Sequence, residues 1–342
     1  MREALLYDLL DGGRVHCRLC AHGCRIAPGA RGICGVRENR DGRLYSLVYG
    51  RLVAQAVDPI EKKPLFHFYP GSTAYSIATA GCNFSCTFCQ NADISQASRL
   101  GGEMIGRDTP PEAVAAAAAR HGCRSVAYTY TEPTIFYEYA ADVGRLAHER
   151  GLANVWVSNG YMADEMLAQA LPAGGPPLID AANVDLKAFR DEFYRQQCGA
   201  RLAPVLDSLR TLKARGVWLE VTTLVIPGLN DGDGELGEIA AFVRDELGAD
   251  TPWHVSRFHP TYRLVDRPPT PPATVRRAWE IGREAGLRYV YVGNLPAGDG
   301  EDTFCPQCGA AVIRRRGFAI SAYRLRSGAC PQCGTPVAGV GL

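Results

Sequence analysis

Three closely spaced cysteines have the residue types and the spacing to do chemistry. They are Cys82, Cys86 and Cys89, separated as C-x3-C-x2-C. Three thiolates can hold three irons of a four-iron, four-sulfur (4Fe-4S) cluster, and the lack of a fourth cysteine in the stretch leaves one iron open for a substrate or cofactor. A closed structural site would instead use four ligands. A zinc loop or three unrelated core cysteines is the alternative. The apolar run 75–80 reads as a buried strand before the motif and favours the cluster.

A second group of cysteines lies near the N-terminus. Its members are Cys17, Cys20, Cys24 and Cys34. A segment this short cannot build a hydrophobic core of its own, so a bound metal must supply the folding free energy. Zinc, which takes four soft ligands in a tetrahedron, and a second iron–sulfur cluster, which would relay electrons to the first, both fit. We favour zinc, with His16 and His22 as exposed loop residues rather than ligands.

A third group of cysteines forms two near-identical knuckles, Cys-Pro-Gln-Cys-Gly, near the C-terminus. Its members are Cys305, Cys308, Cys330 and Cys333. Paired C-x2-C knuckles are typical of a zinc ribbon, with a rubredoxin-like iron site as the lesser alternative. The run Arg314 to Arg316 makes this segment locally basic, and we expect a solvated hairpin face rather than a nucleic-acid contact.

The composition limits the classes of function that the 342-residue chain can have. A formal net charge of +1 gives no global field for nucleic acid or an anionic membrane. Of the thirteen cysteines, only Cys123 and Cys198 lie outside the three groups, and such clustering indicates metal ligation in a reducing compartment rather than disulfides. We expect Cys123 to lie in the core and Cys198 to be a half-buried thiol, with a position facing the site as the alternative. The first residues do not resemble a signal peptide, and no apolar run approaches the length of a membrane span. We therefore expect a cytoplasmic protein.

Apolar, β-rich stretches alternate with helical patterns from residue 75 onward. Strands are predicted at 75–80, 124–130, 153–158, 178–186, 217–226, 253–258 and 288–292. Helices are predicted at 110–121, 133–150, 163–171, 204–215, 234–247 and 271–286. This alternation indicates a parallel sheet with crossover helices, in which the chemistry lies at the carboxyl ends of the strands. The pattern alone fits a barrel as well as an open doubly wound sheet.

A connector precedes the strand that leads to the three cysteines. Residues 58–65 place two prolines around Glu61, Lys62 and Lys63, which predicts a rigid, non-helical segment. The charged trio is either solvated or lines the approach to the cluster. The chain is divided into an N-terminal metal-binding extension with connector (1–72), a barrel (73–295) and a C-terminal ribbon (296–342), with residues 296–300 as the ribbon's linker.

Polar residues follow five successive strands of the predicted sheet. The segments are 128–133, 157–160, 183–187, 225–231 and 256–260. Each segment alone is compatible with an ordinary turn or a helix start. Together they predict a polar rim around the cluster.

The cluster motif, with Phe88 just before its last cysteine, resembles the signature of the radical S-adenosylmethionine (SAM) enzymes. Other matching elements follow in order: the N-terminal cysteines, the connector 58–65, Asp185-Leu-Lys187, 256–258 and 292–294. This arrangement resembles the AmmeMemoRadiSam-system radical SAM enzymes, relatives of the pyruvate formate-lyase activating enzymes, over essentially the whole chain. The resemblance implies an α/β fold: a partial (β/α)6 TIM-like radical SAM barrel with an N-terminal Cys-rich metal knuckle and a C-terminal zinc ribbon.

The resemblance also implies that the three motif cysteines ligate a cluster whose open iron chelates the methionyl amine and carboxylate of SAM. Phe88 would lie against the adenine. Glu132 stands where the family's GGE element binds the methionyl ammonium, although Tyr130 and Thr131 replace the two glycines. The segment 225–231 resembles the later barrel loop that neighbours the adenosyl group.

Two further elements of the activating enzymes have counterparts in this chain. Ser158, Asn159 and Gly160 occupy the place of the ribose-side TNG element, with serine in place of threonine. Asp185 and Lys187 match the DLK element, whose aspartate helps to bind a monovalent cation near the sulfonium.

The activity that the resemblance implies is reductive cleavage of SAM to a 5′-deoxyadenosyl radical that abstracts hydrogen from a substrate. We favour a small-molecule substrate, because the match extends beyond the activase core; the alternative is a glycyl-radical enzyme activase that acts on a partner protein. Expected partners are a flavodoxin- or ferredoxin-type electron donor and Memo-like and AMMECR-type proteins, with no membrane and no nucleic acid. An electron-transfer module or a nucleic-acid adaptor agrees less well with an open iron, a polar rim and near-neutral charge.

Overall fold

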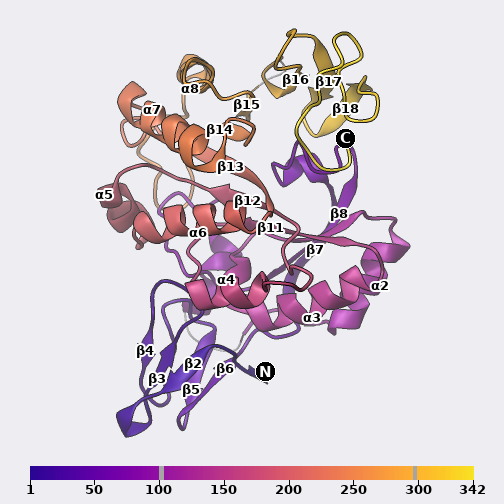
Figure 1. Ribbon diagram of the computed structural model, residues 1–342. Helices are drawn as coiled ribbons and strands as arrows, with labels where there is room; N and C mark the ends of the chain where they lie inside the picture. The colour runs from indigo at the N-terminus through magenta and orange to yellow at the C-terminus, as the bar shows by residue number, and fades with distance from the viewer. Residues whose placement is uncertain (100–103, 296–298) are drawn as a thin grey trace.

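A nine-stranded sheet forms the centre of the computed structural model, which describes residues 1–99, 104–295 and 299–342 (Figure 1). Its strand order is β15-β14-β13-β12-β11-β10-β8-β7-β9, and all neighbouring pairs are parallel except the two that β7 makes, with β8 and with β9. The parallel strands are β8 (Thr73–Thr79), β10 (Ser125–Tyr128), β11 (Ala153–Ser158), β12 (Ala181–Asp185), β13 (Trp218–Val225), β14 (Trp253–Arg257) and β15 (Val290–Gly293). The predicted strands are therefore all present, and the predicted ribbon linker lies partly outside the described residues.

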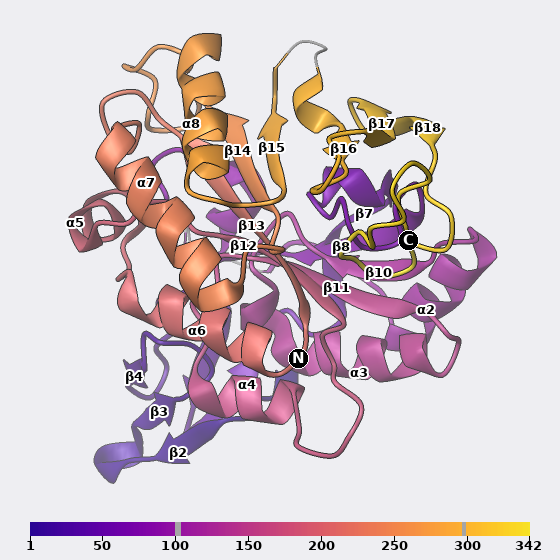
Figure 2. The ribbon, with the colours of Figure 1, turned by 45° about the horizontal axis from the view of Figure 1, so that its top comes forward.

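Helices connect successive parallel strands and lie together on one side of the sheet (Figures 1 and 2). They are α2 (Pro111–Arg120), α3 (Tyr137–His148), α4 (Asp164–Ala170), α6 (Ala203–Ala214), α7 (Asp233–Phe242) and α8 (Pro272–Glu284). Proline at the first helical position of α2 supplies a backbone angle suited to a helix start. The strand order leaves β15 and β9 at the two edges, and the connecting helices cover one side of the sheet, so the sheet is a partial barrel, as predicted.

The sheet begins before the predicted barrel segment. Strand β7 (Arg51–Pro59) pairs antiparallel with β8, and the short β9 (Arg107–Asp108) pairs with β7. The connector then makes one 3₁₀ turn, Ile60–Lys62, so the prediction that it contains no helix is wrong for that turn. Strand β7 belongs to the same sheet as the barrel strands, although it lies on the N-terminal side of residue 72. The domain boundary near that residue therefore stays a prediction.

The N-terminal extension consists of two small antiparallel sheets, drawn in indigo in Figure 1. One contains β1 (Arg2–Glu3), β5 (Arg37–Arg40) and β6 (Arg43–Ser46), and the other contains β2 (Tyr7–Leu9), β3 (Val15–Cys17) and β4 (Arg25–Ile26). Arg37 is buried and donates from Nη2 to Glu138 Oε1 at 2.7 Å, which fixes the extension to α3.

The C-terminal ribbon is a three-stranded antiparallel sheet of β16 (Thr303–Phe304), β17 (Ala311–Arg316) and β18 (Ala319–Tyr323). A hydrophobic cluster joins it to the barrel through Phe66 and Tyr291. Arg315 is buried, lies 4.3 Å from the centre of the Phe66 ring and donates to the Phe66 carbonyl at 2.8 Å. The expectation of a solvated basic face is therefore wrong for Arg315, whereas Arg314 and Arg316 are exposed.

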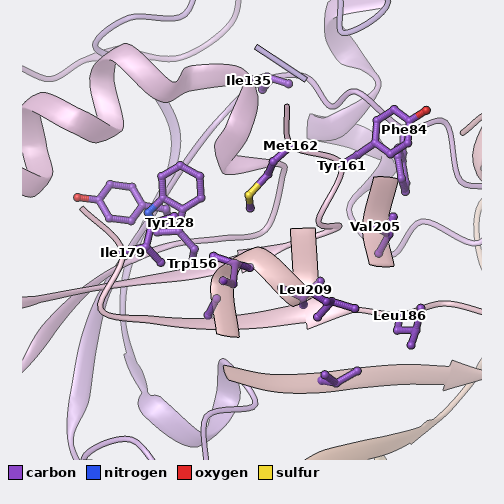
Figure 3. Close-up of a cluster of buried hydrophobic side chains, with 14 of the residues drawn as sticks. Phe84, Tyr128, Ile135, Trp156, Tyr161, Met162, Ile179, Leu186, Val205 and Leu209 are labelled. Carbon is purple, nitrogen blue, oxygen red and sulfur yellow. The ribbon is translucent and has the colours of Figure 1, made fainter. Parts of the chain in front are cut away.

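The main hydrophobic core reaches the loop that carries the three motif cysteines (Figure 3). Trp156 and Tyr128 fill the space between the sheet and its helices, and Tyr128 donates to Asn154 Oδ1 at 3.0 Å. Phe84, inside the motif, packs edge-on against Tyr161 with ring centres 5.2 Å apart. The loop with the three motif cysteines is thus anchored on the buried core. None of the described helices is both long and apolar enough to cross a bilayer.

Candidate active site

The three motif cysteines follow β8 and line one cavity of about 730 Å³. Gly81 turns the chain at this point with φ of 99°. A Cβ on Gly81 would lie 2.6 Å from Val36 Cγ1 and 3.0 Å from the Cys34 carbonyl oxygen, so only glycine fits. The turn directs Cys82, Cys86 and Cys89 into the cavity at the carboxyl end of the sheet.

A segment after β12 holds the motif from its other side. The backbone N–H groups of Ser85 and Thr87 donate to the carbonyl oxygens of Cys198 and Gln197, both at 2.9 Å. Cys198 is fully buried, so the expectation of a half-buried thiol is wrong. Cys123 lies in the core, as predicted.

The surroundings of the thiols shift their pKa values in different directions. A hydrogen bond with Cys198 lowers the pKa of Cys86. Burial raises the pKa of Cys82 and of Cys89. Bound iron requires thiolates, so the metal itself would have to hold Cys82 and Cys89 ionised.

Glu132 joins the ends of two neighbouring strands. It follows β10, is buried, and accepts hydrogen bonds from Thr134 N at 3.1 Å, Ser158 Oγ at 2.8 Å and Asn159 N at 2.8 Å. Burial raises the pKa of its carboxyl group. The Asn159 side chain in turn donates to Asn83 Oδ1 at 2.7 Å and lies 3.9 Å from Cys82 Sγ, so the ends of β10 and β11 are tied to the motif.

Asp185 and Lys187 form an ion pair at the end of β12, with 2.7 Å between Oδ2 and Nζ. Burial alone would lower the pKa of Lys187, but the neighbouring Asp185 and Cys86 raise it. Lys187 Nζ also lies 5.7 Å from the centre of the Phe88 ring. The structure therefore brings the predicted binding residues to the same cavity: Phe88, Glu132, Ser158, Asn159, Asp185 and Lys187. The role of each one stays a prediction.

A second polar group lines the cavity and was only partly foreseen. Tyr130 adopts φ of 64° at a position where the resemblance implies glycine, and its hydroxyl donates to Asp58. Lys63 is buried, lies 2.6 Å from Asp58 Oδ2 and sits 4.6 Å from the Tyr130 ring centre. Burial lowers the pKa of Lys63 to about 8. The connector lysines line the cavity, as one of the two expectations had it. Their contact with Tyr130 could not be predicted from the sequence, in which the only hint was that Tyr130 and Thr131 replace the two glycines of the GGE element.

The far side of the cavity comes from β14 and from the ribbon. His254 and Ser256 line it on β14, while Glu301 and Phe318 line it from the ribbon. His254 donates to Glu220 Oε2 at 2.7 Å, which places a buried carboxylate behind the cavity wall. Sequence analysis missed both His254 and Glu220, because each lies inside a predicted strand.

The loop 225–231 was expected to neighbour the adenosyl group. Among the described residues that line the cavity, β13 contributes Thr222 and Leu224 instead. Asn230 of the loop is buried and donates to the carbonyl oxygens of Lys187 at 2.6 Å and Leu224 at 2.9 Å. The loop thus supports the site from behind.

The ribbon cysteines form a compact group that could hold a metal ion. Their sulfurs all lie within 4.8 Å of one another, with 3.5 Å between Cys305 and Cys333 and 3.7 Å between Cys308 and Cys330. This arrangement supports the predicted C-terminal metal site, and the identity of the metal stays a prediction.

The N-terminal cysteines line a separate small cavity together with His22. His22 is half-buried and donates to the Asn83 carbonyl at 2.8 Å. His16 lies half-buried on β3, so the expectation of exposed loop residues is wrong for both histidines.

Comparisons with known proteins agree with this geometry. A family model for the radical SAM superfamily matches residues 76–242. The chain is 46% identical over 339 residues to the uncharacterised protein MJ0808 of Methanocaldococcus jannaschii, with 98% of this chain and 99% of that protein covered. The chain belongs to the radical SAM superfamily. Superfamily membership implies SAM, a 4Fe-4S cluster and an electron donor, and the three thiols around one cavity fit such a cluster.

Relatives of lower sequence identity include activating enzymes. The benzylsuccinate synthase activating enzyme of Thauera aromatica is 25% identical over 271 residues, covering 75% of this chain and 77% of that protein. Among solved structures, a radical SAM methyltransferase from Sphaerobacter thermophilus aligns with a TM-score of 0.52 and 18% identity, covering 68% of this chain and 71% of that chain. This structural likeness shows the fold alone.

Proposed function

We propose that this radical SAM protein cleaves SAM reductively and removes a hydrogen atom from a small-molecule substrate. One observation carries the proposal. Cys82, Cys86 and Cys89 line a large cavity together with Glu132 and Lys187, and no fourth cysteine is among the described residues that line it. Such a site keeps one iron position free, as a reactive centre requires.

When bound by the three thiolates, the cluster would supply an electron to the sulfonium of SAM, which gives methionine and a 5′-deoxyadenosyl radical. The chain's own residues position the reactants and exclude water. Glu132 Oε2 accepts one described hydrogen bond, from Asn159 N, so a lone pair remains for the methionyl ammonium. Phe88 offers an apolar face for the adenine, with the Asp185–Lys187 pair beside it.

The position of the ribbon supports a small substrate. Glu301 and Phe318 of the ribbon line the same cavity as the motif cysteines, and buried Arg315 fixes the ribbon to the barrel. An activase has to admit a peptide segment of its partner to the cluster, and a wall at this place restricts such access. Memo-like and AMMECR-type proteins remain the proposed partners, with a flavodoxin- or ferredoxin-type electron donor.

Activation of a glycyl-radical enzyme is the second candidate function. It is favoured by the similarity to the benzylsuccinate synthase activating enzyme, which extends over 75% of this chain. A glycyl EPR signal on mixing the reduced protein and SAM with a glycyl-radical enzyme encoded nearby would support this alternative over the small-molecule function.

Anaerobic reconstitution with iron and sulfide tests the proposed chemistry. After addition of dithionite and SAM, we expect 5′-deoxyadenosine by mass spectrometry from the wild type and from Cys123→Ala, whose thiol lies in the core. Cys86→Ala should yield none. Equal, background-level product from the wild type and Cys86→Ala would rule out the proposed activity.

A further inference from the structure

The N-terminal cysteines form a group that the proposed reaction does not use. They line one small cavity whose other lining residues are mainly apolar, with Leu19, Ile26, Ile33 and Ile135 among them. Cys17 and Cys34 are buried, and Cys20 and Cys24 are half-buried. Four thiols around an apolar cavity are a ligand set for a soft metal centre.

The spacing of these thiols differs from that of the ribbon thiols. A tetrahedral zinc ion with Zn–S bonds of about 2.3 Å brings its four sulfurs to roughly 3.8 Å from one another. The ribbon sulfurs match this value at 3.5 and 3.7 Å. In the described part of the chain, only the ribbon group gathers three or more potential ligand atoms within 4.8 Å.

The N-terminal sulfurs are therefore too far apart for a single ion, although all four residues face the same cavity. A 4Fe-4S cluster carries its four thiolates on four different irons, so its ligand sulfurs are more widely spaced than those around one ion. The observed arrangement fits a cluster better than zinc.

A buried cation lies next to this group. Arg37 lines the cavity and is paired through its Nη atoms with Glu138. Its Nε is buried and has no hydrogen-bond partner among the described residues. A sulfur of a bound cluster would accept from this N–H, which accounts for an otherwise uncompensated donor.

The N-terminal group also touches the barrel motif directly. His22, which lines the N-terminal cavity, donates to the carbonyl oxygen of Asn83, the residue after Cys82. On the other side, the Cys34 carbonyl accepts from Ser98 Oγ at 3.0 Å and lies against Gly81. The segments that carry the two cysteine groups are therefore in direct contact on two sides.

We propose that Cys17, Cys20, Cys24 and Cys34 hold a second 4Fe-4S cluster, closed by four thiolates, that relays electrons to the cluster at the barrel mouth. A reduced flavodoxin- or ferredoxin-type donor loses one electron, the N-terminal cluster passes it on, and the barrel cluster gains it. This assignment departs from the zinc that the sequence favours. The assignment of the N-terminal cluster does not depend on the proposed function, whereas its role as an electron relay rests on that function.

Metal analysis of a variant without the barrel site tests the assignment. In full-length Cys82→Ala/Cys86→Ala/Cys89→Ala, reconstituted without oxygen, we expect about four irons and four sulfides per chain and Mössbauer parameters of a cluster with four thiolate ligands. The wild type should hold about twice as much iron. A variant with no iron and two zinc ions per chain would overturn the proposal. Because this variant lacks the radical site, the result does not depend on the proposed function.

The relay role is tested by changing the reductant. In Cys20→Ala/Cys24→Ala, 5′-deoxyadenosine formation should persist with dithionite, which reaches the barrel site directly, and should fall at least tenfold with a reduced flavodoxin. Equal rates with both reductants would overturn the relay. If this variant does not fold, EPR of the reduced wild type decides: we expect about two spins per chain with only one signal shifted by SAM, and a single spin would contradict the proposal. Absence of 5′-deoxyadenosine from the wild type with dithionite would instead count against the proposed function.

Discussion

The cysteines at the barrel mouth and those of the ribbon have the same chemistry but opposite geometries. Three cysteines line a cavity of about 730 Å³ at the barrel mouth. Four cysteines converge within 4.8 Å in the ribbon. Under the proposed function, the number of thiols and the space between them would separate a site that reacts from a site that holds a fold.

The two regions also differ in what positions their thiols. In the ribbon, each knuckle repeats one local turn, in which Gly309 N donates to the Cys305 carbonyl at 3.0 Å and Gly334 N to the Cys330 carbonyl at 2.9 Å. The barrel cysteines depend instead on distant residues such as Asn159 and Cys198. Local turns therefore place the ribbon thiols, whereas the barrel thiols are placed by contacts between segments that are far apart in the chain.

Removal of one barrel ligand should have the largest effect on activity. Cys89→Ser is expected to lose the barrel cluster and all detectable SAM cleavage while it keeps the ribbon metal, because each thiolate holds one iron of an incomplete ligand set. Iron and zinc contents and 5′-deoxyadenosine formation are the measurements. Loss of the ribbon metal in this variant would show that the two regions are not independent.

The reciprocal change should act first on folding. Cys305→Ser is expected to release the ribbon metal and to unfold the ribbon, because structural zinc sites contribute about 10–16 kcal/mol of binding free energy. Limited proteolysis and metal analysis check this, with the exposed Ser321→Ala of β18 as the control. The barrel iron should remain. Retention of both the metal and protease resistance would contradict a closed four-thiolate site.

A change behind the cluster should have an intermediate effect. Glu132→Gln is expected to lower SAM cleavage about 10- to 100-fold, as is usual for residues that orient a metal site, because it disturbs the contacts with Ser158 and Asn159. The affinity for SAM, followed by the EPR shift, should weaken as well if the carboxylate binds the methionyl ammonium. Glu112→Gln on the exposed face of α2 is the matched control. An unchanged SAM affinity would restrict Glu132 to a positioning role.

Much of the fold could be predicted because its signals are local. The apolar run of β8, the proline at the start of α2 and the glycine after α3 lie within or next to the elements that they specify. The pairing of β7 with β8 could not be predicted, because its register depends on packing between segments. The parallel sheet with crossover helices followed from the order of the elements. The (β/α)6 barrel was implied only by the family resemblance, and the edge strands were not predicted.

The residues of the candidate site also fall into those with a local sequence signal and those without one. The C-x3-C-x2-C spacing is a local pattern, and so are the polar residues that end β11 and β12. The contact of Tyr130 with Asp58 and that of His254 with Glu220 join residues far apart in the chain. No periodicity or spacing encodes such contacts, which depend on how the sheet brings neighbouring strands together.

Substitution of Cys198 should have the smallest effect on activity, and it tests directly whether the barrel site has three thiolate ligands or four. Its buried thiol forms a hydrogen bond with the Cys86 thiol and lowers the pKa of Cys86. Cys198 is therefore the cysteine that would supply a fourth ligand if the site were closed. In an open site, Cys198→Ala removes one hydrogen bond worth about 1 kcal/mol, and SAM cleavage should stay within about tenfold of the wild type. Iron content and the SAM-induced EPR shift should match those of Cys123→Ala, which removes another buried thiol at a distance from the cavity. Loss of iron in Cys198→Ala, or a SAM response that appears only in this variant, would mean that the barrel site already has four ligands and that the contrast with the ribbon fails.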